Sequence, residues 1–206
     1  MPERTPSLDR PLREALAAVS TATLTTILFN KGLRNCFMRE VYPVRTGKPS
    51  MVGPAYTLRF IPAREDVDSL FERDSRTDLQ RVTAETVPTG AVLVIDSRGD
   101  ASAASGGALL ALRMQMRGVA GIVTDGGFRD SPEVGRLAMP AYHQRGAAPP
   151  VVVRHHPQDV QLPIACGGVA VLPGDVIVGD DEGVVVIPRG MASEVARLAV
   201  SKEKME

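Results

Sequence analysis

The sequence predicts a single domain of the α/β class, and two observations support this prediction. Near the middle of the chain, residues 90–96 and Gly121–Thr124 are continuously apolar runs, typical of strands buried on both faces. They flank a glycine loop and a helical segment, an order that predicts a βαβ unit with parallel strands and a right-handed crossover. The second half of the chain is rich in short β-favouring runs that turn residues separate.

The segments before this unit predict helices and one long strand. Ser20 is a good N-cap for a helix that Gly32 would end. The charged residues of segment 64–78 are typical of a solvated connection. The predicted elements are, in order, a helix over residues 8–19, a helix over Thr21–Asn30, a strand over Met51–Pro62 and a helix over Leu79–Thr86.

The segments from the crossover helix onward follow the same logic. Residues 108–117 predict the crossover helix, because Leu109, Leu112 and Met116 share one helical face and a glycine follows. Residues 190–206 predict a closing amphipathic helix. Between the two helices, the short β-rich runs are residues 151–154, 169–172, 175–178 and 183–187.

Composition and charge exclude several function classes. Hydrophobic residues make up 44% and charged residues 23% of the 206 residues, which is typical of one globular domain. Basic and acidic residues both number 24, so the charge balance does not favour nucleic-acid binding. No segment approaches the roughly 20 apolar residues of a membrane span. Cys36 and Cys166 lack metal-binding or redox spacing. We therefore expect a cytoplasmic protein that binds neither nucleic acid nor membrane.

Two loops follow the carboxyl ends of the predicted parallel strands, where ligands bind in open α/β sheets. The first ends in Gly106 and Gly107 at a helix start, where free N–H groups and the helix dipole favour an anion. A tight turn without a ligand is the alternative. The loop matches neither G-x-G-x-x-G nor G-x-x-x-x-G-K-[ST], so it does not indicate a nucleotide site.

The second loop lies within the stretch GIVTDGGFRDSPEV. Ser131 before Pro132 is a good helix start, so Asp130 is not needed as the cap. An aspartate freed from capping, beside an arginine at a strand end, favours a site in which Asp130 binds a hard divalent cation. Arg129 would then bind a substrate carboxylate with its planar fork. The alternative is an ordinary surface ion pair.

The histidines and the acidic turn carry weaker signals. His143 follows the short helix and either faces the same pocket or is structural. His155 and His156 are expected at the surface. Asp180 and its two acidic neighbours resemble a metal cluster, but turn chemistry accounts for them.

The segment GGALLALRMQMRGVAGIVTDGGFRD resembles the core of the family of regulators of ribonuclease activity (RraA) and 4-hydroxy-4-methyl-2-oxoglutarate aldolases. VSTATL near Val19 and LPGDVIVGDDEGVVVIP near the C-terminus match the same family in order and spacing. The resemblance therefore runs from about Val19 to Pro188. It implies a swivelling β/β/α fold over the single domain of residues 1–206. It also implies a homotrimer or a dimer of trimers, with active sites near subunit boundaries.

The aldolase branch of this family implies a metal-dependent lyase of the class II pyruvate-aldolase type. Such an enzyme acts on a small 2-oxo acid and also decarboxylates oxaloacetate. By resemblance, Arg129 binds the substrate carboxylate and Asp130 binds Mg²⁺ or Mn²⁺. The loop whose backbone amides hold the pyruvoyl end corresponds to Gly107, Ala108, Leu109 and Leu110.

One position departs from the aldolase pattern, because Ala108 stands where the aldolases have an acidic residue. Two hypotheses remain open. The first is a metal-dependent aldolase or decarboxylase of 2-oxo acids, which the intact Arg129 and Asp130 favour. The second is a non-catalytic regulator that binds a ribonuclease or another protein partner, which Ala108 favours.

Overall fold

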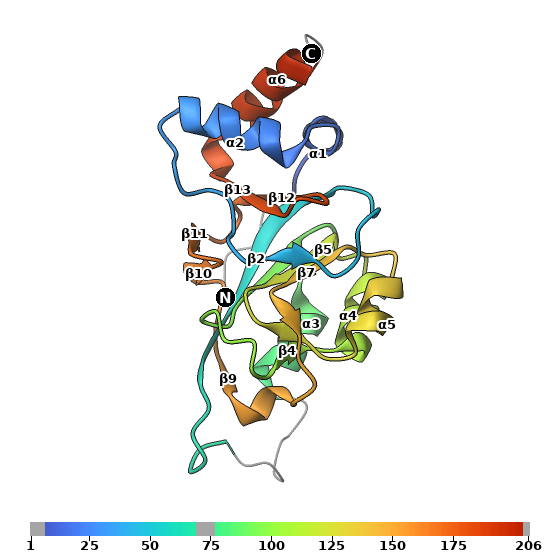
Figure 1. Cartoon of the computed structure of the whole chain (residues 1–206), viewed down its shortest axis with the longest axis vertical. Helices are drawn as coiled ribbons and strands as arrows, with labels where there is room; N and C mark the ends of the chain where they lie inside the picture. The colour runs from blue at the N-terminus through green and yellow to red at the C-terminus, as the bar shows by residue number, and fades with distance from the viewer. Residues whose placement is uncertain (1–6, 69–76, 204–206) are drawn as a thin grey trace.

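The computed structural model describes residues 7–68 and 77–203; part of the predicted connection (69–76) and the last residues of the predicted final helix (204–206) lie outside this description. Its largest sheet has the strand order β1-β7-β5-β3-β2-β12-β13, and β9 also pairs with β2 (Figure 1). The strands of this sheet are β1 (Tyr42–Pro43), β2 (Met51–Pro62), β3 (Val92–Asp96), β5 (Gly121–Thr124), β7 (Ala141–His143), β9 (His155–Val160), β12 (Val176–Gly179) and β13 (Val184–Ile187).

The long strand β2 joins the parallel and antiparallel parts of this sheet. Residues 55–59 of β2 pair in parallel with β3, while its two ends pair antiparallel with β12 and β9. The parallel part continues through β5 and β7. Since α4 (Ala108–Met116) lies between β3 and β5 in the chain, the predicted βαβ unit is confirmed. Both strands are buried along their length, as their unbroken apolar sequence predicts.

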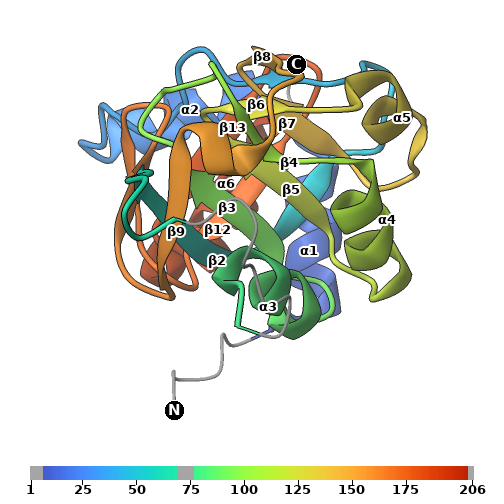
Figure 2. The ribbon, with the colours of Figure 1, turned by 90° about the horizontal axis from the view of Figure 1, so that it is seen from below.

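The helices cover the sheet in two groups. Figure 2 shows α3 (Leu79–Thr86), α4 and α5 (Ser131–Arg136) along one side of the parallel strands, where they share a hydrophobic cluster with the sheet. A second cluster joins β12 and β13 to the remaining helices, α1 (Arg10–Ala17), α2 (Thr21–Asn30) and α6 (Ala192–Glu203). The opposite face of the parallel strands packs on a hairpin of β10 (Ile164–Cys166) and β11 (Val169–Val171).

A second, small sheet was not predicted. It consists of three short parallel strands in the order β4-β6-β8. Each strand has only two or three residues, and each contains glycine: β4 (Ala104–Gly106), β6 (Gly127–Phe128) and β8 (Arg145–Gly146). This sheet lies where the loops after β3 and β5 continue, so it positions both of the candidate loops.

Three predictions about local structure are wrong. Val151–Val153 forms a 3₁₀ helix, η1, instead of a strand. His155 is buried rather than exposed, because its ring stacks on Phe60 with 5.5 Å between ring centroids; His156 is half-buried. Ser131 is the first residue of α5 instead of its cap, and its hydroxyl donates to the Phe128 carbonyl at 2.7 Å.

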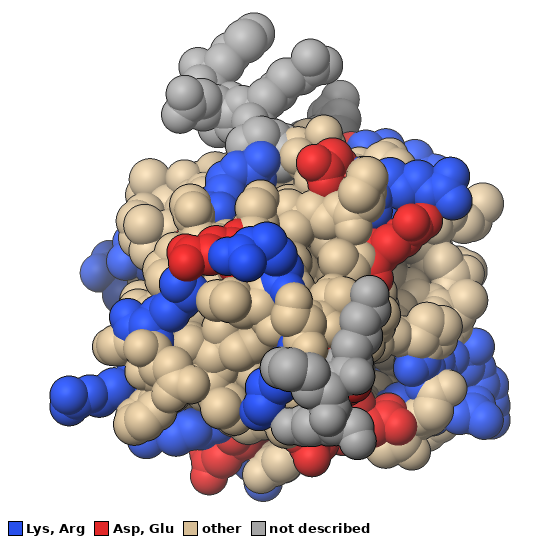
Figure 3. Space-filling view, turned by 90° about the horizontal axis from the view of Figure 1, so that it is seen from above, with Lys and Arg blue, Asp and Glu red and all other residues tan. Residues whose placement is uncertain are grey.

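The surface at the end formed by α1, α2 and α6 carries both charge signs. Figure 3 shows acidic and basic side chains interspersed over this face, which agrees with their equal numbers in the sequence. Within residues 7–68 and 77–203, no single helix is long and apolar enough to cross a membrane. Only α1 and α2 taken together, bent by 105°, reach such a length and composition.

Candidate functional site

The small sheet brings the two candidate loops together. Gly107 follows β4 and Arg129 follows β6, and these strands are parallel neighbours in which Gly106 pairs with Phe128. The Arg129 N–H donates to the Gly106 carbonyl at 3.0 Å. Two segments about twenty residues apart therefore meet at the same edge, where the strands of the small sheet end.

Glycine at position 107 allows this close approach. A Cβ at this position would lie 2.7 Å from Arg129 Cγ and 3.1 Å from Asp130 Oδ2. The backbone of Gly107 is extended, with φ −149°, so the requirement is for space and not for an unusual backbone conformation. The glycine therefore holds the loop directly against Arg129 and Asp130.

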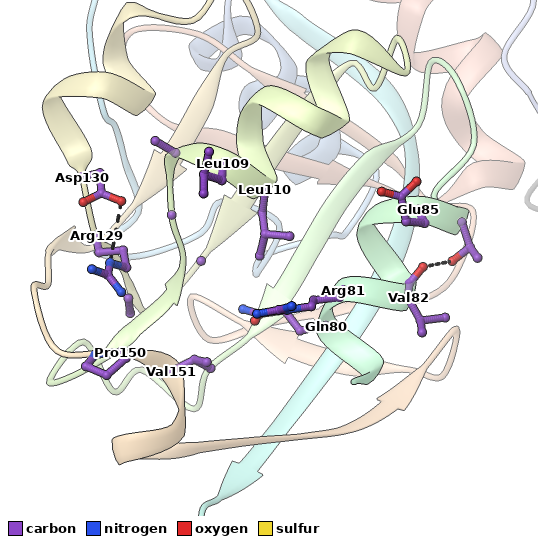
Figure 4. A pocket seen from close by; sticks show the side chains of 15 residues that line it. Gln80, Arg81, Val82, Glu85, Leu109, Leu110, Arg129, Asp130, Pro150 and Val151 are labelled. Carbon is purple, nitrogen blue, oxygen red and sulfur yellow. Dashed lines mark hydrogen bonds and ion pairs between the residues drawn. The ribbon is translucent and has the colours of Figure 1, made fainter. Parts of the chain in front are cut away.

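One cavity of about 1000 Å³ contains all of the predicted site residues (Figure 4). Gly107, Ala108, Leu109, Leu110, Arg129 and Asp130 line it. The sequence did not indicate the opposite wall, which α3 provides. The remaining lining residues come from α3, from β4 and from the start of η1: Gln80, Arg81, Val82, Glu85, Thr86, Ala104, Gly106, Pro150 and Val151.

Asp130 presents its carboxylate to this cavity. Its backbone has φ 54° and ψ 37°, a left-handed conformation that aspartate adopts more readily than most residues. Asp130 occupies the N-cap position of α5, yet within the described part of the chain its side chain makes no capping hydrogen bond. Arg129 Nε lies 3.6 Å from Asp130 Oδ2, and both side chains are about half exposed. The carboxylate oxygens thus remain accessible to a cation.

The donor set restricts which metal ion the site can bind. Among the described residues, no group of three His, Cys, Asp or Glu side chains is placed to hold a metal ion. Asp130 would therefore supply one oxygen ligand, and substrate and water would supply the others. Mg²⁺ accepts this arrangement because it retains several waters in protein sites, and carboxylate oxygens also suit Mn²⁺. A structural zinc site would need four protein ligands and does not fit.

The amino end of α4 adds an anion-binding element beside Asp130. Gly107 is the N-cap of this nine-residue helix and has no side chain with which to cap it. The first-turn N–H groups, from Ala108 to Leu110, belong to residues that line the cavity. These groups and the positive end of the helix dipole favour a carboxylate or a polarised carbonyl oxygen.

Three buried hydroxyl groups form a hydrogen-bond network next to the loop that carries Gly107. Ser97, Ser105 and Thr124 are fully buried, and their hydroxyl oxygens lie 2.7 to 3.1 Å from one another. The Gly126 N–H donates to Thr124 Oγ1 at 2.9 Å, and Gln80 Nε2 donates to the Ser105 carbonyl at 2.6 Å. This network links the ends of β3 and β5 to β4 and to α3. It therefore restricts movement of the loop that carries Gly107.

The acid that Ala108 replaces has no evident substitute in the cavity. Asp96 lines a different cavity, of about 550 Å³, and Asp100 accepts the Ser102 N–H in its own loop. Among the described residues, the carboxylates that line the larger cavity belong to Asp130 and Glu85.

Glu85 is already engaged, and His143 lies outside the cavity lining. Arg113 binds the Glu85 carboxylate at 2.8 Å and lowers the pKa of Glu85. His143 stacks on Phe128 with 5.7 Å between ring centroids, and burial lowers the pKa of His143 to about 4. The structural alternative for His143 is therefore the one that the geometry supports.

Comparisons with known proteins agree with this architecture. The chain matches the RraA-like family, described as Aldolase/RraA, over residues 17–186. The crystal structure of Streptomyces coelicolor RraAS2, "an unusual member of the RNase ES inhibitor RraA protein family", shares 33% identity with a TM-score of 0.86 and covers 97% of this chain and 96% of that chain. The swivelling β/β/α fold that the resemblance implies is confirmed.

Several curated relatives, including the two described next, carry the name "Putative 4-hydroxy-4-methyl-2-oxoglutarate aldolase". The relative from Halalkalibacterium halodurans is 38% identical over 114 residues, which cover 55% of this chain and 54% of that protein. The relative from Burkholderia mallei is 34% identical over 145 residues, 68% of this chain and 76% of that protein. The chain thus spans about half the length of the first of these relatives. From the family match and the fold together, this chain belongs to the RraA-like family.

Proposed function

We propose that this protein is a divalent-metal-dependent lyase that acts on a 2-oxo acid, as a pyruvate-type aldolase, an oxaloacetate decarboxylase or both. One observation carries the proposal: Arg129, Asp130 and the uncapped amino end of α4 line the same cavity. A 2-oxo acid presents a carboxylate and a keto oxygen side by side, which matches this set of groups. The names of the two aldolase relatives support the same reaction class.

Each residue has a defined role in this proposal. The planar guanidinium of Arg129 binds and orients the substrate carboxylate. The first-turn N–H groups of α4 donate to the oxygens of the same end of the substrate. Asp130 holds Mg²⁺ or Mn²⁺. When bound, the ion would withdraw electron density from the keto oxygen as the C3–C4 bond breaks.

The composition of the cavity favours decarboxylation over aldol cleavage. Cleavage of a 4-hydroxy-2-oxo acid requires a base that removes the C4 hydroxyl proton. Decarboxylation of oxaloacetate removes no such proton. Ala108 supplies no acid or base, and Glu85 forms an ion pair with Arg113. The side chains of this cavity therefore suit decarboxylation better than aldol cleavage.

We also propose a homotrimer whose interface lies beside the cavity. Leu109, Leu112 and Met116 share one face of α4 and are 84%, 41% and 74% exposed, so an apolar stripe remains uncovered in a single chain. Replacing Met116 with glutamate should shift the assembly toward smaller species in light scattering coupled to size-exclusion chromatography. A wild-type protein that elutes as a monomer would contradict this proposal.

A regulatory function is the second candidate, and the likeness to RraAS2 favours it. That structure is described as belonging to the RNase ES inhibitor family, and it covers nearly the whole of this chain. In this alternative the protein binds a ribonuclease or another protein partner and performs no chemistry. Binding alone has no evident need for Arg129 beside Asp130 in a cavity.

Pyruvate release from oxaloacetate, with Mg²⁺ or Mn²⁺ present, tests the proposed function. We expect turnover that EDTA and Asp130→Ala both abolish. Glu133→Ala is the matched control, because Glu133 is an exposed acid in α5 that pairs with Arg136 and is absent from the described cavity lining. Turnover no faster than the metal alone, from a folded wild-type protein, would contradict the lyase and favour the regulator.

A further inference from the structure

The wall that faces Arg129 carries a second arginine. Arg81 lies in the first turns of α3 and lines the cavity. In Figure 4 its side chain extends from α3 toward the glycine loop, on the other side of the cavity from Arg129. Within residues 7–68 and 77–203, its guanidinium forms no hydrogen bond and no ion pair. Among the described residues, no carboxylate is therefore paired with this guanidinium.

The acidic neighbours of Arg81 are engaged by other groups. Glu85 lies one turn further along α3, where a helix normally provides an ion-pair partner. Its carboxylate instead binds Arg113 at 2.8 Å and lies 3.8 Å from Arg117. Asp78 caps α3 and accepts the backbone N–H of Arg81 at 3.2 Å. Both carboxylates thus have other partners, and the Arg81 guanidinium remains available to a ligand.

The cavity that both arginines line has the volume of a small-molecule site. Its volume of about 1000 Å³ is at the upper end of the roughly 300–1,000 Å³ that small-molecule sites span. In Figure 4, the apolar side chains of Leu110, from α4, and Val151, from η1, line other parts of the same cavity. A ligand with an anionic group at each end and a less polar remainder would match this set of groups.

We propose that Arg81 is a specificity-determining residue that binds a second anionic group of the substrate, remote from the keto acid at Arg129. This inference rests on the proposed function, because Arg129 and Asp130 must hold the 2-oxo acid end. It concerns substrates such as 4-hydroxy-4-methyl-2-oxoglutarate, whose distal carboxylate stays on the fragment that is released. The distal carboxylate of oxaloacetate is the group that is lost, so Arg81 does not serve that substrate.

The group at Arg81 must keep its charge throughout the reaction. When a carboxylate leaves as CO₂, its negative charge passes to the carbon skeleton. An ion pair with that departing carboxylate would stabilise the ground state more than the transition state and would slow the reaction. Arg81 therefore suits a carboxylate that is not the one lost, on a fragment that remains intact.

Calorimetric binding in the presence of Mg²⁺ tests this inference without requiring turnover. The probes are 2-oxoadipate and 2-oxohexanoate, six-carbon acids that differ only in whether the far end is a carboxylate or a methyl group. We expect the wild type to bind 2-oxoadipate about tenfold more tightly, as a hydrogen bond between charged groups provides. Arg81→Gln should remove this preference and leave the affinity for 2-oxohexanoate unchanged.

Two further variants complete the test. Arg34→Gln, the same change at an exposed arginine that does not belong to the described cavity lining, should keep the preference. Arg81→Lys should retain part of it, because the positive charge remains. Equal affinity for the two acids in the wild type, or an unchanged preference in Arg81→Gln, would overturn the role of Arg81. If neither acid binds the wild type, the proposed function itself fails and this inference fails with it.

Discussion

Replacing Gly107 with alanine tests how closely the glycine loop approaches Arg129 and Asp130. A Cβ at position 107 would lie 2.7 Å from Arg129 Cγ, whereas ordinary van der Waals contact begins at 3.4 Å. The Arg129 side chain must therefore move by about 0.7 Å. A misplacement of roughly 1 Å can cost about 100-fold in rate, so we expect kcat/KM for oxaloacetate to fall by about 10- to 100-fold. This corresponds to about 1.4–2.8 kcal/mol.

The fold should tolerate the same change. Arg129 Cγ lies close to the backbone, so it moves only if the Arg129 side chain changes its rotamer or the loop shifts slightly; because Arg129 is half exposed, neither change disturbs the core. Gly107→Ala keeps an allowed backbone conformation, but alanine is a poorer N-cap than glycine, and we expect the unfolding free energy to fall by about 1–2 kcal/mol. The unfolding temperature would then fall by about 2–8 °C.

Gly106→Ala is the matched control for this prediction. Its Cβ would lie 3.7 Å from the Phe128 ring, an ordinary contact, so kcat/KM should stay within about twofold of the wild type. Both variants are assayed for oxaloacetate turnover and for Mn²⁺ binding. If Gly107→Ala is as active as Gly106→Ala, the close-approach argument is refuted.

Three further predictions concern residues around the site. Thr124→Val removes the oxygen that accepts the Gly126 N–H and should lower the unfolding free energy by about 1–3 kcal/mol in urea denaturation, with the exposed Thr26→Val as control; equal effects of the two variants would contradict the buried network. Burial raises the pKa of Asp125 from 3.8 to about 6. The folded protein therefore holds a proton between these pH values that the unfolded chain lacks, and the unfolding free energy falls as pH rises through that window. A carbon NMR titration of the Asp125 carboxyl should have its midpoint near pH 6, and a midpoint near 4 would contradict the burial argument. Ala108→Asp should raise cleavage of 4-hydroxy-4-methyl-2-oxoglutarate by at least about tenfold relative to oxaloacetate decarboxylation; an equal change in both rates would show that this position does not serve proton transfer.

The parts of the site that follow from local sequence patterns were predicted from the sequence. The apolar runs of β3 and β5, followed by loops and then helices, placed Gly107 and Asp130 at strand ends, and the cavity contains both. The prediction that the Asp130 carboxylate is not used for capping agrees with the structure, although the reason differs. Asp130 itself occupies the N-cap position of α5. Its backbone is left-handed, and within the described chain its side chain makes no capping hydrogen bond.

Features that depend on contacts between segments far apart in the chain could not be predicted from the sequence. The small sheet pairs strands such as β4 and β6, which are too short and glycine-rich to show any periodicity. His155 is buried because β9 pairs with β2 and places its ring on Phe60. The role of Arg81 as part of the cavity wall likewise depends on α3 packing beside α4, which the sequence of α3 alone does not indicate.

The most direct test of the central claim is a Mn²⁺ binding measurement by calorimetry, with and without oxalate, a small dicarboxylate that imitates the 2-oxo acid end. We predict one Mn²⁺ per chain, bound more tightly with oxalate present. Asp130→Asn should lose the ion, while Arg129→Gln should keep it and lose the effect of oxalate. Equal Mn²⁺ binding by the wild type and by Asp130→Asn would contradict the assignment of Asp130 as the metal ligand and the lyase built on it.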